Sequence, residues 1–299
     1  MSSFNIALVL LSSLLHSIWN ILTQTSENSQ IFSGLKGVWI TIMALTAYAW
    51  FGIAPLSNEI LVWAFLSGIL HGIYILCLSR AYATADISYV YPIARSAPVF
   101  VPVFAWLLLG ERLGILTLLA IALILTAIYM LHFKGHIIQG FKNLFEAFRH
   151  QDLRWAFYTL IMVVSYSLVD KKGMVSFLEH LPDQPIANGV TFFFMEATIG
   201  FAVCNLYLFK NFPAKNIFRI WRSEWHKGFL AGLATLGAYG LICVVLQFEN
   251  LSAIVSIRQV SVLMVVSWGC WKLKEPFGRQ RLLAGALIIL GVFLIGNRA

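Results

Sequence analysis

The chain has 299 residues, of which 60% are apolar and only 11% are charged, and its mean hydropathy is +0.81. So little polar surface excludes a soluble globular protein of this size and indicates a protein of the lipid bilayer. The formal net charge of +8 lies mainly in the connections between apolar stretches. This distribution favours contact with anionic lipid headgroups over contact with nucleic acid.

Apolar stretches long enough to cross a bilayer recur along the whole chain. A transmembrane helix needs about 20 mostly apolar residues, and helices are the default because lipid offers no partner to backbone polar groups. The first stretch follows no Lys or Arg and has no small-residue cleavage motif, so we expect it to be retained. Ten spans are predicted, at residues 3–23, 32–52, 60–82, 86–109, 113–132, 155–175, 186–209, 227–248, 251–272 and 279–297.

Two stretches 164 residues apart are nearly identical: residues 118–124 read LLAIALI and residues 282–288 read LLAGALI. The same offset aligns Glu111 with Glu275. An internal duplication in so apolar a chain is typical of carriers built from two copies of one bundle. Each copy holds five spans, an odd number, so the second enters the membrane in the opposite direction. The predicted fold class is an all-α polytopic membrane protein with ten transmembrane helices in two inverted five-helix repeats.

Residues 1–135 are predicted to form the first repeat, residues 136–153 an amphipathic interfacial linker, and residues 154–299 the second repeat. The connection from Lys210 to Lys227 has a similar amphipathic character, and we expect it to anchor to headgroups rather than to dock a regulatory partner. Most of the 21 Lys and Arg residues, Lys36 among them, fall on the side of these two connections. The positive-inside rule therefore places that side in the cytoplasm and both termini outside.

Two arginines lie inside predicted spans, where a charge costs about 2.5–3.5 kcal/mol on insertion scales unless it faces a partner or a wet cavity. We predict that Arg95 and Arg258 bind an anionic group or gate the path. The alternatives are a structural ion pair and, for Arg258, extension of the side chain to the interface. Tyr91 lies one turn before Arg95. Gln259 takes the position of Arg95 at the repeat offset.

The first span carries a polar stripe, since Ser13, His16, Asn20 and Thr23 follow one another at three- and four-residue spacing. We expect this stripe to face the interior. Trp19 lies beside it. Hydrogen bonding between helices is the alternative role for its Ser and Thr residues, whereas His16 can also carry a proton.

Two acidic residues fall within or near the spans of the second half. Glu196 lies deep in a Phe-rich span, where a carboxylate should be protonated or paired with an arginine. Asp170 lies one turn after Tyr166. We expect Asp170 to pair at the surface with its neighbours Lys171 and Lys172, and a role in coupling is the second interpretation.

His71 and Tyr74 in the third span and Tyr239 in the eighth complete the predicted ring of polar and aromatic side chains. The predicted substrate-binding residues are Arg95, Arg258, Tyr91, His16, Trp19, Asn20, Tyr74, Tyr166, Gln259 and Tyr239. The candidates for proton coupling are Glu196, Asp170, His16 and His71.

Motifs of soluble enzymes are missing from the sequence: it has no G-x-S-x-G, no H-E-x-x-H and no phosphate-binding loop. The four cysteines stand singly in apolar spans and are predicted to be buried thiols. We therefore expect no enzyme activity, no cofactor and no metal.

Several motifs resemble those of a known family. The run YPIARSAP from Tyr91, followed by LGERL from Leu109, resembles the core of an EamA-type repeat of the drug/metabolite transporter superfamily, as does KEP from Lys274 with the apolar stretch after it. A bacterial branch has motifs similar to HxxWN from His16, YSxxDK from Tyr166 and IRQxSV from Ile257. The resemblance covers essentially the whole chain and is specific for the superfamily, not for a substrate.

The resemblance implies a ten-helix transporter whose central cavity is formed mainly by the first, third, fourth, sixth, eighth and ninth helices and opens alternately to the two sides. Substrates in the superfamily are small metabolites such as amino acids, other zwitterions, nucleotide derivatives or cations, often exported and often exchanged with protons. Many relatives keep both termini in the cytoplasm, contrary to the charge distribution here. The superfamily also includes members inserted the other way, so we retain the orientation that the charges predict.

Together, these features predict a secondary active transporter of a small anionic or zwitterionic metabolite that resembles a carboxylate, a phosphonate or an amino acid. Export is favoured over import, and proton coupling is left open. The alternatives are a cationic drug or amine exporter and a non-transporting membrane protein, either an intramembrane enzyme or a lipid-handling scaffold. We expect a monomer or homodimer in the bacterial cytoplasmic (inner) membrane, in contact with lipids and a small-molecule substrate.

Overall fold

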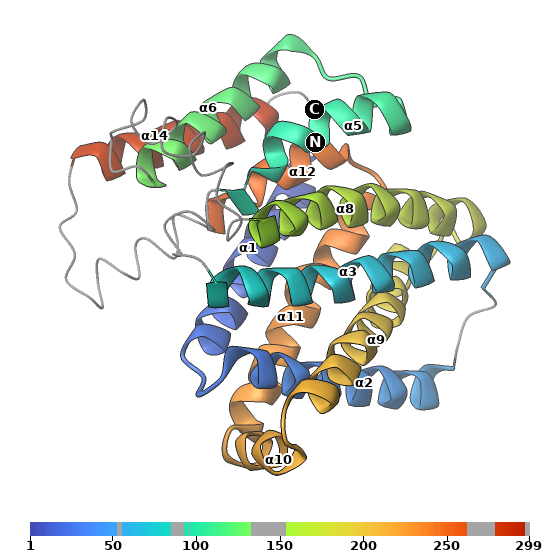
Figure 1. The fold of residues 1–299 in the computed structure, drawn as a ribbon. Coiled ribbons are helices and arrows are strands. Elements are labelled where there is room, and N and C mark those ends of the chain that lie inside the picture. Colours follow the sequence, from blue (N-terminus) through green and yellow to red (C-terminus); the bar gives the residue numbers. More distant parts are fainter. Residues whose placement is uncertain (53–55, 85–92, 95, 133–153, 262–278, 297–299) are drawn as a thin grey trace.

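The computed structural model describes residues 1–52, 56–84, 93–94, 96–132, 154–261 and 279–296, and over these residues its regular secondary structure is entirely helical (Figure 1). The helices of the first half are α1 (Ser3–Gln24), α2 (Ser29–Phe51), α3 (Asn58–Thr84), α5 (Ala97–Leu109) and α6 (Ile115–His132). Those of the second half are α8 (Arg154–His180), α9 (Pro185–Asn211), α10 (Ala214–Ser223), α11 (Trp225–Leu246), α12 (Leu251–Ile257) and α14 (Arg279–Gly296).

Five of the described helices, α1, α2, α3, α9 and α11, are long and apolar enough to cross a membrane, and α5, α6 and α14 are shorter apolar helices. Helix α8 has a comparable length, 27 residues, but carries Asp170, Lys171 and Lys172 in one run. The fourth and ninth predicted spans are described only in part, by α5 and α12. The predicted interfacial linker, residues 136–153, lies outside the described residues.

The outer surface of the bundle is apolar. Large side chains such as Leu45, Trp50, Phe51, Trp106 and Leu107 are more than half exposed. In water, a contiguous surface of this kind would drive aggregation, whereas in a bilayer it contacts acyl chains. The chain is therefore a multi-pass membrane protein whose polar groups turn inward.

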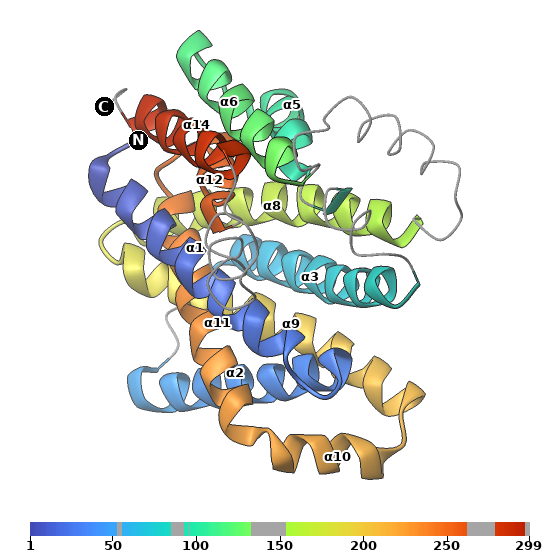
Figure 2. The same ribbon diagram turned by 90° about the vertical axis from the view of Figure 1, so that its left-hand side faces the viewer.

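Helices from the two halves pack against one another in reciprocal pairs. Helix α1 packs on α11 and α3 packs on α8, while α6 and α14 lie side by side (Figures 1 and 2). The start of α1 and the end of α14 are near each other in both views, at the end of the molecule away from α10.

Glycines bring α3 and α9 into close contact. A Cβ atom placed on Gly200 of α9 would lie 3.0 Å from the carbonyl oxygen of Gly68 and 3.2 Å from the backbone nitrogen of Gly72, both on α3. Small residues four apart allow two helix backbones to approach in this way. The contact sets the distance between the polar residues that neighbour these glycines.

Helix α10 is a short amphipathic helix that closes one end of the bundle (Figure 2). Its residues Ile217 and Ile220 are buried, and the indole nitrogen of Trp221 donates a hydrogen bond to the carbonyl of Ile31 at 2.9 Å. Arg219 forms an ion pair with Glu27 in the connection between α1 and α2. The hydrogen bond from Arg219 lowers the pKa of Glu27.

Helix α12 is buried along its whole length, and a carboxylate from the other half caps its first turn. Glu111 accepts hydrogen bonds from the backbone nitrogens of Leu251 at 2.5 Å and Ser252 at 3.3 Å, and from the hydroxyl of Ser252 at 2.7 Å. A carboxylate satisfies the free N–H groups of a helix start and interacts favourably with its dipole. The glutamate of the LGERL motif therefore joins the two halves.

Candidate functional site

Two carboxylates from neighbouring helices meet inside the bundle. Asp170 of α8 is 0% exposed and Glu196 of α9 is 1% exposed. The hydroxyl of Ser67 on α3 lies 2.5 Å from Oδ1 of Asp170 and 2.6 Å from Oε2 of Glu196. The close contact of α3 with α9 places Ser67, next to Gly68, within reach of Glu196.

The hydrogen bonds of this carboxylate pair require an additional proton. A serine hydroxyl carries one proton and donates one hydrogen bond, while an ionised carboxylate can only accept. Ser67 can therefore donate to Asp170 or to Glu196, but not to both. The second short contact needs a proton on one of the two carboxyl groups, which then donates to the oxygen of Ser67.

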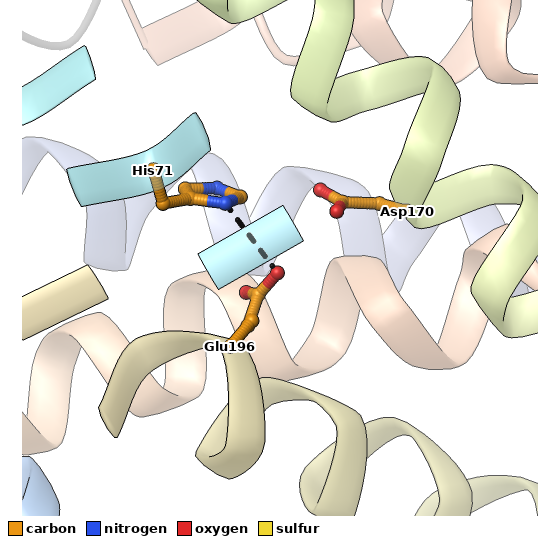
Figure 3. Close-up of side chains that lie close together, drawn as sticks. All are labelled: His71, Asp170 and Glu196. Carbon is orange, nitrogen blue, oxygen red and sulfur yellow. Dashed lines mark ion pairs between the residues drawn. The ribbon is translucent and has the colours of Figure 1, made fainter. Parts of the chain in front are cut away.

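Aromatic and imidazole side chains surround the carboxylate pair. The hydroxyl of Tyr239 on α11 donates to Oδ2 of Asp170. His71 of α3 stacks on Tyr166 with the ring centroids 3.9 Å apart. Its Nδ1 lies 3.5 Å from Oε2 of Glu196, and Figure 3 shows His71, Asp170 and Glu196 pointing toward one another from three helices.

The tautomer of His71 follows from its backbone contact. Nδ1 lies 3.1 Å from the carbonyl oxygen of Ser67, which can only accept, so Nδ1 carries a proton. In the neutral ring, Nε2 is then a free acceptor. It is buried, and no group among the described residues hydrogen-bonds to it.

The donor atoms of His71, Asp170 and Glu196 all lie within 4.8 Å of one another. One imidazole nitrogen and two carboxylate oxygens are a donor set that suits a divalent transition metal. In this structure, the hydroxyl of Ser67 connects the same two carboxylates through hydrogen bonds. The geometry can thus hold either a proton or a cation between the carboxylates.

An inner cavity of about 90 Å³ opens beside these residues. Its walls carry both signs of charge, because Glu196, Arg258 and Lys36 all line it. Arg258 follows the last residue of α12, and its guanidinium carbon lies 5.2 Å from the ring centroid of Tyr239. Aromatic and imidazole rings make up much of the remaining wall, among them those of His16, Trp19, His71, Tyr74, Tyr166 and Tyr239.

Two further cavities adjoin the inner one. An outer cavity of about 480 Å³ lies where α1 and α3 end and α2 begins, and it shares Trp19, Lys36 and Tyr74 with the inner cavity. A third cavity of about 70 Å³ is lined by Asn20 and Gln259 and shares Arg258 with the inner cavity. Lys36 and Arg258 therefore lie on two different sides of the inner cavity.

The structure brings together most of the residues predicted from the sequence. Arg95 and Tyr91 lie outside the described residues, and Asp170 adjoins the inner cavity through its hydrogen bonds. The other predicted residues line at least one of the three cavities: Arg258, His16, Trp19, Asn20, Tyr74, Tyr166, Gln259, Tyr239, Glu196 and His71.

The expected surface pairing of Asp170 with the following lysines is wrong. The side chain of Asp170 turns into the bundle, while Nζ of Lys171 donates to the carbonyl oxygens of Leu246 at 2.7 Å and Glu249 at 3.0 Å. Successive residues of a helix point about 100° apart. Neighbours in the sequence therefore need not share an environment.

The assignment of Lys36 to the cytoplasmic surface is also wrong. Lys36 is only 4% exposed, and its Nζ lies 3.8 Å from the ring centroid of Trp19. Its position near the start of a predicted span suggested the surface, but α2 begins at Ser29, two turns earlier. Ser67 was not predicted either. The only signal was its place one turn before His71 on the same helix face.

An apolar exterior, a buried polar centre and cavities of solute size define a multi-pass membrane protein built around an internal binding site. The profile of the EamA-like transporter family matches residues 3–133. Over its N-terminal half the chain therefore belongs to the EamA-like transporter family of the drug/metabolite transporter superfamily. This membership implies a transporter of a small molecule.

Solved structures support the fold over the whole length. A crystal structure described only as that of a protein is 15% identical in sequence and superposes with a TM-score of 0.71, covering 98% of this chain and 96% of its own. At this identity the likeness shows a shared fold alone. No curated protein matches the sequence.

Proposed function

We propose that the protein is a secondary active transporter that moves a small zwitterionic or anionic metabolite by alternating access, in exchange with protons. One observation carries the proposal: the inner cavity is lined by a carboxylate, Glu196, and a guanidinium, Arg258, and is walled by aromatic rings. A solute with both an acidic and a basic group finds a partner for each in this cavity.

The packing of the two halves supports two inverted repeats. If α1, α3, α8 and α11 are equivalent in pairs, an axis that exchanges α1 with α8 and α3 with α11 turns the α1–α11 contact into the α8–α3 contact. Both contacts are extensive. Such an axis in the membrane plane is the arrangement in which one repeat rocks against the other around a central site.

The two sides of the site differ in a way that suits one state of an alternating cycle. On the side of α10, the outer cavity reaches Lys36. On the opposite side, hydrogen bonds join the helices: Glu249 after α11 accepts from Ser2 at 3.0 Å and Asn5 at 2.7 Å, and Asn188 donates to Gln247 at 3.2 Å. In the orientation that the charges predict, the state is open to the cytoplasm, as an exporter awaiting its substrate would be.

The carboxylate pair supports proton exchange. Asp170 and Glu196 hold one proton through Ser67 when the site has the geometry seen here. Movement of α3 relative to α8 and α9 would separate the two carboxylates and release that proton. A cationic drug or amine exporter is the second candidate, favoured by the same carboxylates and aromatic rings, but Lys36 and Arg258 would repel a cation from the inner cavity.

Transport assays in proteoliposomes test the proposal. Three probes of equal length are suitable: β-alanine carries both charges, propionate the acid alone and n-propylamine the amine alone. We expect counterflow of β-alanine or propionate with wild-type protein, and at least about tenfold less with Arg258→Gln. The matched control is Arg222→Gln on the exposed face of α10, which should transport like wild type. Counterflow of n-propylamine alone would favour the amine exporter, and no flux of any probe would contradict the proposal.

A further inference from the structure

We infer that Lys36 is the anion-binding residue at the entrance of the site: its ammonium receives the carboxylate, phosphonate or phosphate of the substrate where the outer cavity meets the inner one. The inference rests on the proposed function and specifies which residue first contacts the acidic group. It also makes α2 a part of the site, whereas the predicted cavity drew on other helices.

The first argument is that Lys36 has no anionic partner of its own. Within the part of the chain that the structure describes, no side chain forms an ion pair with its ammonium and no oxygen accepts a hydrogen bond from it. Its side chain nonetheless lies in the interior of the bundle. Burying an ammonium group without a partner is costly, so a conserved balance of charge requires an anion or a water-filled space beside it.

The second argument is the position of the ammonium group. Lys36 lines both the inner cavity and the outer cavity, together with Trp19. A solute that enters from the outer cavity therefore passes this ammonium before it reaches Glu196 and Arg258. The three N–H donors of a lysine can turn toward a bound oxyanion in this space.

Two aromatic rings hold the ammonium group in place. Its Nζ lies 3.8 Å from the ring centroid of Trp19 and 5.4 Å from that of Phe201. Cation–π contacts offset part of the desolvation cost but leave the hydrogen-bond donors unused. They explain how Lys36 stays charged in the empty site and why an incoming oxyanion gains full hydrogen bonds there.

The arrangement specifies a substrate with two ends. An acidic group at Lys36 leaves the other end of the molecule to face Glu196 and the free Nε2 of His71, which both accept hydrogen bonds. A primary ammonium group satisfies both acceptors. The site therefore favours a short zwitterion over a simple acid, and a simple acid over an amine.

Equilibrium binding to the purified full-length protein tests the inference, with β-alanine, propionate, methylphosphonate and n-propylamine as probes. We expect Lys36→Met to weaken the binding of the three acidic probes at least about tenfold. Lys36→Arg should retain part of the affinity because it keeps the charge. Lys215→Met on exposed α10 is the matched control and should bind like wild type.

A measurement on wild-type protein avoids dependence on the folding of the variant. Reductive methylation followed by peptide mass spectrometry reports the accessibility of each lysine. Propionate should slow the methylation of Lys36 and leave that of Lys215 unchanged. Failure of propionate to protect Lys36, or binding of acidic probes by Lys36→Met at wild-type affinity, would overturn the inference while the proposed function stands. Binding of n-propylamine alone by wild-type protein would overturn both.

Discussion

Asp170 and Glu196, on different helices, compete for the single hydroxyl proton of Ser67, which lies 2.5 Å from one carboxylate and 2.6 Å from the other. Both contacts can be hydrogen bonds only when one of the carboxyls holds a proton. The pair is therefore a place where the arrangement of helices and the binding of a proton depend on each other.

Asp170→Asn should uncouple transport from the pH gradient. An amide cannot exchange a proton with Glu196, but it preserves the shape of Asp170 and can still contact Ser67. We expect counterflow of substrate to persist, while accumulation driven by a pH gradient across proteoliposomes is lost. Asp183→Asn, at an exposed position just before α9, is the control. Unchanged gradient-driven accumulation in Asp170→Asn would show that the pair is not the coupling site.

Gly200→Ala should destabilise the contact between α3 and α9. The added Cβ would lie 3.0 Å from the carbonyl oxygen of Gly68, a backbone atom that cannot move without shifting the helix. We expect a loss of about 1–3 kcal/mol, as is typical for overpacking, measured as a lower midpoint of thermal unfolding. Gly240→Ala is a matched control because its Cβ would meet only the side chain of Leu236, at 3.6 Å. Equal midpoints for the two variants would contradict the close packing.

Glu111→Gln should weaken the start of α12. The glutamine side chain has one acceptor oxygen in place of two and no charge to interact with the helix dipole. We expect about 0.5–2 kcal/mol of lost stability and a lower affinity for substrate, because α12 positions Arg258. The measurements are thermal unfolding and equilibrium binding of β-alanine, with exposed Glu179→Gln as the control. A variant as stable as wild type would exclude the capping role.

The ion pair between Glu27 and Arg219 should give a small pH-dependent contribution to stability. The hydrogen bond from Arg219 lowers the pKa of Glu27 in the folded protein. A depressed pKa stabilises the fold at pH values above the ordinary pKa of glutamate, about 4.3, and this contribution is lost as the pH falls through the lowered pKa. The difference in unfolding midpoint between wild type and Arg219→Gln should therefore be visible at neutral pH and shrink in acid. Arg222→Gln, which lacks this ion pair, should show no such trend.

The positions of the membrane-crossing helices and many of the site residues could be predicted from the sequence. Length and apolarity determine a span because they are properties of a contiguous segment, and α1, α3, α9 and α11 begin and end within a few residues of the predicted ranges. Glu196 and Arg258 were recognisable because a charge within such a segment has few favourable places. His71 was identified on the same grounds, as a polar residue in an apolar helix.

The tertiary structure alone decided which polar residues meet. Lys36 and Asp170 were predicted to lie at the surface because each is close to a predicted helix end or to other charges, yet both turn inward. The Ser67 hydroxyl gains its role only because Gly68, Gly72 and Gly200 let α3 approach α9 closely enough for Ser67 to contact two carboxylates. Hydrophobicity is summed along one segment and can be read locally, whereas a shared proton depends on distances between three helices, which only their packing determines.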